Sequence, residues 1–140
     1  AMANSKLVSF LLRAGLAVVF LYAGIASLLD PISWVGYIPA WLREIVPAET
    51  FLLVHAVGEI ILALWLLSGK RAFEAAIVSA LAMAGIIIFN LNLLDVVFRD
   101  FAILVMALAL AVLAKPTVIR YRIPYAFYRD FYRSFICRPD

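Results

Sequence analysis

Two titratable side chains lie one helical turn apart in the middle of an apolar stretch of the sequence. His55 and Glu59 are four residues apart, so in a helix they lie on the same face. A charge near the centre of a lipid bilayer costs from about 2.5 kcal/mol upward, so residues of this kind face the protein interior and are candidates for function. Imidazole and carboxylate groups can bind a polar ligand or transfer protons. We therefore treat His55 and Glu59 as candidate ligand-binding residues.

A third charge, Arg13, interrupts the first apolar stretch. Counted from the ends of their stretches at ~1.5 Å per residue, Arg13 and Glu59 differ in height by roughly 9 Å, most of which a long guanidinium side chain can span. The sequence therefore predicts a buried Arg13–Glu59 ion pair. Its role is open: the pair either fixes helix register or takes part in ligand or proton handling. In the alternative arrangement Arg13 extends to the cytoplasmic headgroups instead.

A second polar cluster is predicted near the outer ends of the third and fourth helices. It consists of Asn90, Asn92, Arg99 and Asp100, at heights that match that of His55. Asp100 is also explained as a helix cap, because the exposed amides at a helix N-terminus favour an anion. Together with the pair on the second helix, the cluster predicts a polar cleft with apolar walls that opens outward. Such a cleft suits an amphipathic ligand with two hydrogen-bonding ends, for example a quinone head group.

The chain contains one cysteine, Cys137, and one histidine. A dithiol relay needs two thiols that can meet. Zinc sites built on several cysteines, iron–sulfur clusters and bis-histidine haem need more ligands than one such chain provides. We therefore expect no metal site and no cofactor within the chain, with a quinone as the candidate ligand. Cys137 is expected to be a free thiol or, alternatively, a palmitoylated cysteine near the membrane.

These residues need elements to position them, and the composition indicates membrane helices. Of the 140 residues, 67% are hydrophobic and 15% are charged, and the mean hydropathy is +1.07. A soluble domain is about half apolar and about a quarter charged, so an ordinary soluble enzyme is excluded. The net charge of +3 does not indicate nucleic acid as a partner, because the basic residues lie at the ends of the apolar stretches.

Four apolar stretches are each long enough to cross a bilayer as a helix. They cover residues 7–29, 51–67, 75–94 and 96–114. On the third stretch, alanines at four-residue intervals predict a buried face, since small residues let helices approach closely in lipid. The predicted fold is all-α: a compact, antiparallel four-helix transmembrane bundle over residues 1–114, followed by a tail over residues 115–140.

Lysine and arginine residues predict the orientation by the positive-inside rule. The basic residues assigned to the inner side are Lys6, Lys70, Arg71, Lys115, Arg120, Arg122, Arg129, Arg133 and Arg138. The opposite side has only Arg43 and, at its edge, Arg99. Both termini are therefore predicted to be cytoplasmic.

The outer connection and the tail are both rich in aromatic residues. Trp and Tyr side chains settle at the headgroup level, so Trp34, Tyr37 and Trp41 are candidates for a lid over the cleft, with a plain interfacial anchor as the alternative. In the tail, aromatic and basic residues recur at helical spacing after Pro124. This pattern predicts an amphipathic helix that contacts the cytoplasmic lipid surface, with docking of a partner protein as the alternative.

Several short motifs follow one another in a characteristic order. They are Arg13-Ala-Gly-Leu-Ala-Val-Val-Phe20-Leu-Tyr-Ala-Gly24, Asp30-Pro31, Gly36-Tyr-Ile-Pro39, Gly58-Glu59-Ile, Leu66-Leu-Ser-Gly69 and Arg99-Asp100. In this order and spacing the sequence resembles the DoxX family of small bacterial four-helix membrane proteins, over about residues 7 to 114. The resemblance implies a multi-pass protein of the bacterial inner membrane, with Arg13, Glu59, Arg99 and Asp100 at the polar positions of the family.

Two functions from different classes stay open. Members of the family include a membrane subunit of thiosulfate:quinone oxidoreductase and a membrane component of a thiol-oxidation and superoxide-handling complex. The resemblance therefore implies a membrane component of a quinone-linked thiol or thiosulfate oxidoreductase system, in which soluble or membrane oxidoreductase subunits are partners. The alternative is a non-catalytic scaffold or assembly factor whose buried charges are structural. A homo-oligomer is compatible with both, and whether the chain is itself an enzyme stays open.

Overall fold

A computed structural model describes residues 2–116, and within this range every regular element is a helix. The four long helices are α1 (Met2–Leu29), α3 (Ala48–Ser68), α4 (Ala72–Phe89) and α5 (Leu94–Ala114). Three short helices lie between them: η1 (Pro31–Tyr37), α2 (Ala40–Ile45) and η2 (Leu91–Leu93). The amphipathic helix predicted in the tail, and Cys137, lie outside the described residues.

Each of the four long helices is long and apolar enough to cross a membrane. The prediction of an all-α fold with four membrane-spanning segments is therefore confirmed in this form. The predicted segments agree with the helices to within a few residues at their ends, except that α1 begins at Met2 and the third helix ends at Phe89. The chain is a multi-pass membrane protein.

Proline and glycine residues determine where the helices begin and end. Pro31 opens η1 and Pro47 immediately precedes α3, at positions where the missing N–H of proline leaves no hydrogen bond unmade. Gly69 ends α3 with a φ of 69°, a left-handed conformation that glycine adopts without steric cost. The connection from α3 to α4 is therefore a tight turn.

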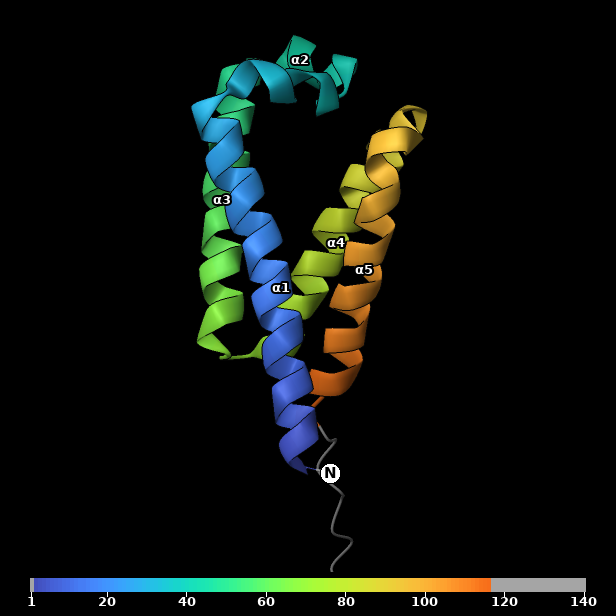
Figure 1. The fold of residues 1–140 in the computed structure, drawn as a ribbon. Helices are drawn as coiled ribbons and strands as arrows, with labels where there is room; N and C mark the ends of the chain where they lie inside the picture. The colour runs from blue at the N-terminus through green and yellow to red at the C-terminus, as the bar shows by residue number, and fades with distance from the viewer. Residues whose placement is uncertain (1, 117–140) are drawn as a thin grey trace, which may run out of the picture.

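The four long helices form two pairs, α1 with α3 and α4 with α5 (Figure 1). The pairs meet at the end that carries the α3–α4 turn, which we call the turn end. They diverge toward the opposite end, which η1 and α2 cross and which we call the lid end (Figure 1). The predicted compact packing of all four helices is therefore found only toward the turn end.

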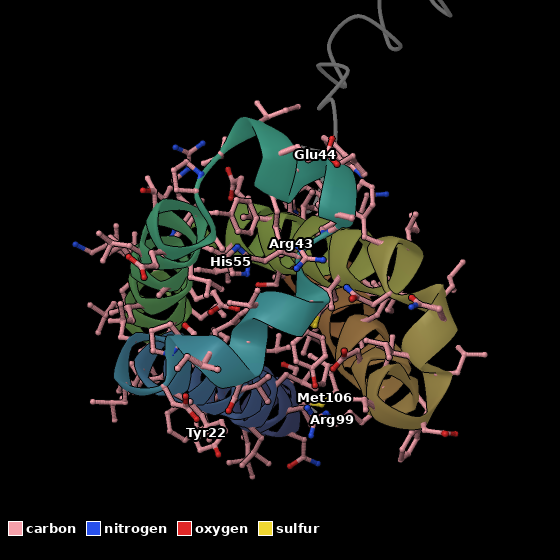
Figure 2. All side chains as sticks on the ribbon, turned by 90° about the horizontal axis from the view of Figure 1, so that it is seen from above. Tyr22, Arg43, Glu44, His55, Arg99 and Met106 are labelled. Atoms are coloured by element: carbon pink, nitrogen blue, oxygen red, sulfur yellow. The ribbon has the colours of Figure 1, made fainter. Side chains whose placement is uncertain are left out.

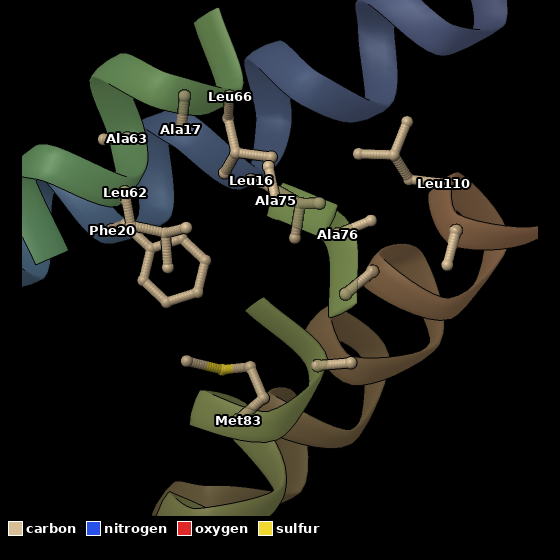
Figure 3. Packing of buried hydrophobic residues seen from close by; sticks show 13 residues of the cluster. Leu16, Ala17, Phe20, Leu62, Ala63, Leu66, Ala75, Ala76, Met83 and Leu110 are labelled. Carbon is tan, nitrogen blue, oxygen red and sulfur yellow. The ribbon is translucent and has the colours of Figure 1, made fainter. Parts of the chain in front are cut away.

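The hydrophobic core joins the two pairs near the turn end (Figure 3). It consists of Leu16, Ala17, Phe20, Leu62, Ala63, Leu66, Ala75, Ala76, Ala80, Met83, Ala107, Leu110 and Ala111. More than half of these residues are alanines, whose small side chains let helix backbones approach closely, the main route to helix association in lipid. The predicted small-residue face of α4 is buried at Ala76 and Ala80, whereas Ala72 and Ala84 are half-buried.

A glycine fixes how α1 lies along α3. A Cβ atom added at Gly24 would lie 2.9 Å from the carbonyl oxygen of Ala56 and 3.0 Å from Cγ1 of Ile60. Real Cβ atoms do not approach a backbone oxygen so closely, so α1 would have to move away from α3. Gly24 therefore sets both the separation and the register of this pair.

We predict that Gly24→Ala lowers the free energy of unfolding by ~1–3 kcal/mol, because the added methyl group overpacks the α1–α3 contact. The matched control is Gly58→Ala in α3, where an added Cβ meets nothing within 4 Å and alanine favours the helix by about 0.5–1 kcal/mol. Unfolding of each variant by titration with a denaturing detergent measures the two changes in the free energy of unfolding. Equal effects of the two substitutions would contradict the close contact at Gly24.

Candidate functional site: a cavity between the helix pairs

A cavity of about 620 Å³ lies between the two helix pairs, on the lid-end side of the core. Its walls are mainly apolar and come from all four long helices, while η1 and α2 contribute residues at the lid end. Pockets for small molecules typically measure ~300–1,000 Å³ and place a few polar groups on apolar walls. The charged and amide side chains on these walls are His55, Glu59, Asn90, Arg99 and Asp100.

The α3 wall carries three residues on successive turns of the helix. Phe51, His55 and Glu59 are each four positions apart, so they lie on one face. His55 Nε2 lies 3.4 Å from Glu59 Oε1, with side-chain exposures of 38% and 9%. The Phe51 ring stacks on the imidazole at a centroid distance of 5.8 Å and an interplanar angle of 10°. In Figure 2, His55 points from α3 toward the space between the helices.

The opposite wall contains the Arg99–Asp100 pair in the second turn of α5. Arg99 Nε lies 3.9 Å from Asp100 Oδ1. The Arg99 side chain is 63% exposed, whereas that of Asp100 is only 15% exposed. Asp100 therefore belongs to the interior of the cavity, and Arg99 belongs to its rim. The prediction of Asp100 as a helix cap does not fit this position, since α5 begins six residues earlier, at Leu94.

Asn90 ends α4 at the lid end of the cavity. Its side-chain Nδ2 donates a hydrogen bond of 2.9 Å to the carbonyl oxygen of Ile86, one of the carbonyls that a helix end leaves without a partner. This bond holds the buried amide in place at the wall. Asn92 is different: it lies in η2, is exposed and does not line the cavity. The helix break at Asn90 separates the two asparagines, which the sequence had suggested act together.

All three predicted lid residues line the lid end of the cavity. Trp34 and Tyr37 belong to η1, and their rings are 5.7 Å apart. Trp41, on α2, contacts the Phe89 ring of α4 at a centroid distance of 6.1 Å. Asp30 holds the start of η1 by accepting a 2.5 Å hydrogen bond from the Ser33 hydroxyl. Aromatic side chains therefore cover the cavity, and one of them reaches across to the second helix pair.

The predicted Arg13–Glu59 pair is wrong. Glu59 lies beside His55, while the Arg13 guanidinium lies against Gly69, where it fills the space that a Cβ would occupy. Arg13 Nε also donates to the Ser9 carbonyl oxygen at 3.3 Å. Gly69 is the C-cap of α3, and the negative end of the helix dipole favours a cation there.

The register of α1 on α3 explains the error. Gly24, not Arg13, is the residue of α1 that lies opposite Glu59, since its added Cβ would be 3.4 Å from Glu59 Cβ. Arg13 is eleven positions before Gly24, which is about 16 Å of helix. Measuring depth from the ends of the apolar stretches underestimated this separation. Arg13 instead extends toward the turn end and lies against Gly69; the alternative, in which it reaches the cytoplasmic headgroups, stays a prediction.

Two contributors to the site escaped prediction. Phe51 was counted only as the start of an apolar stretch, although its four-residue spacing from His55 could have identified it. Phe89 carries no signal in the sequence, because its role depends on where α2 lies over α4.

No known protein family, curated protein or solved structure matches the chain. The resemblance to the DoxX family therefore stays a prediction based on the motifs alone.

We predict that Arg13→Leu and Glu59→Leu change the free energy of unfolding additively, to within ~0.5 kcal/mol, because the two residues share no contact. His55→Leu and Glu59→Leu should instead show a coupling above ~0.5 kcal/mol, since these side chains touch. Double-mutant cycles in a denaturing-detergent titration measure both couplings. A coupling between Arg13 and Glu59 as large as that of the neighbouring pair would contradict the described register.

Proposed function

We propose that the cavity binds the head group of a membrane quinone and that the chain is the membrane component of a quinone-linked thiol or thiosulfate oxidoreductase system. One observation carries the proposal: an apolar cavity of ligand size has hydrogen-bonding groups on two facing helix pairs, His55 and Glu59 on α3 and Arg99 and Asp100 on α5. Such a distribution suits a flat ring with a polar atom at each end.

The types of side chain fit the two carbonyl oxygens of a quinone. His55 can donate an N–H to one oxygen, and the Arg99 guanidinium, which has only donors, can serve the other. Phe51 supports the imidazole by stacking on it, and the aromatic lid supplies further ring surfaces. These contacts would bind and orient the ring, while the apolar walls exclude water.

Reduction of a quinone to a quinol takes up two electrons and two protons. Glu59 lies on the α3 wall of the cavity and Asp100 on the α5 wall. Each carboxyl group can pass a proton to or from the nearer quinone oxygen. A thiol or thiosulfate donor would supply the electrons, either directly or through a partner subunit. The single cysteine of the chain cannot form a dithiol relay by itself.

The distribution of basic residues supports an orientation with the turn end in the cytoplasm. Lys6 and Lys115 lie near the helix ends at the turn end, and Lys70 and Arg71 lie in the turn itself. By the positive-inside rule, the described ends of the chain are cytoplasmic and the four helices of the proposed protein cross the membrane in alternating directions. The resemblance to the DoxX family implies that this membrane is the bacterial inner membrane. The cavity then lies in the outer half of the membrane, where an extracytoplasmic donor can approach the lid.

Binding of ubiquinone-0, which has the head group but no tail, tests the proposal. We expect saturable binding to the protein in lipid nanodiscs by calorimetry, weakened about tenfold by His55→Ala, which removes a hydrogen bond to the ring. Glu59→Gln should weaken it to a similar extent, because it removes the charge beside the imidazole N–H. The control is Asn92→Ala, which removes a polar side chain near the same end but outside the cavity. A lack of saturable binding, or an affinity that neither cavity variant changes, would favour the non-catalytic scaffold instead.

A further inference from the structure

Helices α1 and α5 approach each other closely at Gly15, and we call the line along which they face each other the α1–α5 seam. A Cβ added at Gly15 would lie 2.9 Å from Cε of Met106, so the two helices touch there. Gly15 thus brings the two helix pairs together next to the core, to which Met106 also packs. Figure 2 shows Met106 and Arg99 at this seam, where α1 and α5 lie next to each other.

The same faces of α1 and α5 continue from this contact toward the lid end. On α1, Val18 and Tyr22 follow Gly15 at intervals of three and four residues; on α5, Ile103 and Arg99 precede Met106 at the same intervals. Residues so spaced form one stripe on a helix. Two turns, or about 10 Å, from the contact, Tyr22 and Arg99 therefore stand at matching heights on opposite sides of the seam.

Val18, Tyr22 and Arg99 form the edge of an opening, and the half-buried Ile103 lies on the cavity wall beside them. Val18, Tyr22, Ile103 and Arg99 all line the cavity. Val18 is 65% exposed and Tyr22 is 71% exposed, and Arg99 is also largely exposed. Side chains that border a cavity and also the outer surface lie at its rim. The cavity therefore reaches the outer surface of the helix bundle between α1 and α5.

The opposite seam, between α3 and α4, is bridged at the lid end. α2 leads directly into α3, and its Trp41 ring contacts Phe89 at the end of α4. In Figure 2, α2 lies over the side of α3 and α4 rather than over the side of α1 and α5. The Trp41–Phe89 contact therefore closes this side at the lid end, where Tyr22 and Arg99 border the cavity on the α1–α5 side. Below the lid end, Leu81 of α4 is 68% exposed and also lines the cavity.

We propose that the ligand of this cavity carries a long apolar tail that leaves through the α1–α5 opening into the bilayer. The inference rests on the proposed quinone site and adds the tail, its exit and the route of binding. A cavity of about 620 Å³ encloses a ring and a short chain, whereas a chain of several isoprenoid units extends beyond it. The four helices are membrane-spanning in length and composition, so the surface outside this opening is bordered by lipid acyl chains. The ligand binds and leaves sideways, within the membrane.

Photolabelling tests the exit directly. The probe is a ubiquinone with two isoprenoid units and a diazirine at the end of the tail, bound to the full chain in nanodiscs. We expect labelled residues on the lipid-facing flanks of α1 and α5 near Tyr22 and Arg99, and excess ubiquinone-0 should abolish the label by occupying the head-group site. Label on α3 and α4, or label that ubiquinone-0 does not remove, overturns the exit alone. If ubiquinone-0 itself does not bind, the proposed quinone site fails, and the exit fails with it.

A narrowed opening provides a second test with a matched control. Val18→Trp places a large ring at the opening, and Val54→Trp places the same ring on α3, at a valine that is 67% exposed and does not line the cavity. We expect Val18→Trp to weaken binding of the two-isoprenoid ubiquinone at least about fivefold, as overpacking would, while ubiquinone-0 binding changes less than about twofold. Val54→Trp should change neither affinity. Equal effects of Val18→Trp on both quinones, or no effect on either, contradict the proposal.

Discussion

The close approach of helices in lipid is the constraint on which the structure depends. Between apolar helices in a bilayer the hydrophobic effect contributes little, so helices associate where small side chains let their backbones meet. Among residues 2–116, such contacts join the two helix pairs near the turn end, through alanines of α4 and α5 and the Gly15–Met106 contact. Toward the lid end the facing walls, which include Phe51, Ile86 and Ile103, border the cavity. The pairs diverge there, and the resulting space is the cavity.

The contacts between helices also determine where the charged side chains lie. Within each pair the helices stay in contact, and Gly24 fixes Glu59 at a height where it faces the cavity. Burial of a lone charge in apolar surroundings is costly. Glu59 accordingly lies beside His55, and Asp100, inside the cavity, lies beside Arg99, which is at the rim. Arg13 lies much nearer the turn end, against the end of α3. The polar groups therefore gather at one cavity because the register of the helices places them there, with two short helices above them.

The sequence predicted the parts of the structure that depend on composition and helical spacing. Long apolar stretches identified four helices, and the four-residue spacing of His55 and Glu59 placed both on one face. Contacts between helices were predicted less well. The height of Arg13 relative to Glu59 depends on Gly24, and a single glycine in a span does not reveal its partner. Asn92 was separated from Asn90 by a local helix break, and the Trp41–Phe89 contact depends on the path of the connection.

Quenching of tryptophan fluorescence by ubiquinone-0 tests most directly whether a ligand binds beneath the lid. Trp34 and Trp41 line the cavity, whereas Trp65 lies at the turn end, where its Nε1 donates to the Lys70 carbonyl oxygen at 2.9 Å. A Trp65→Phe variant retains only the lid tryptophans among the three in the chain, and a Trp34→Phe/Trp41→Phe variant retains only Trp65. The account predicts saturable quenching in the first variant and only weak, non-saturating quenching in the second. Equal, non-saturating quenching in both variants would contradict a binding site beneath the lid.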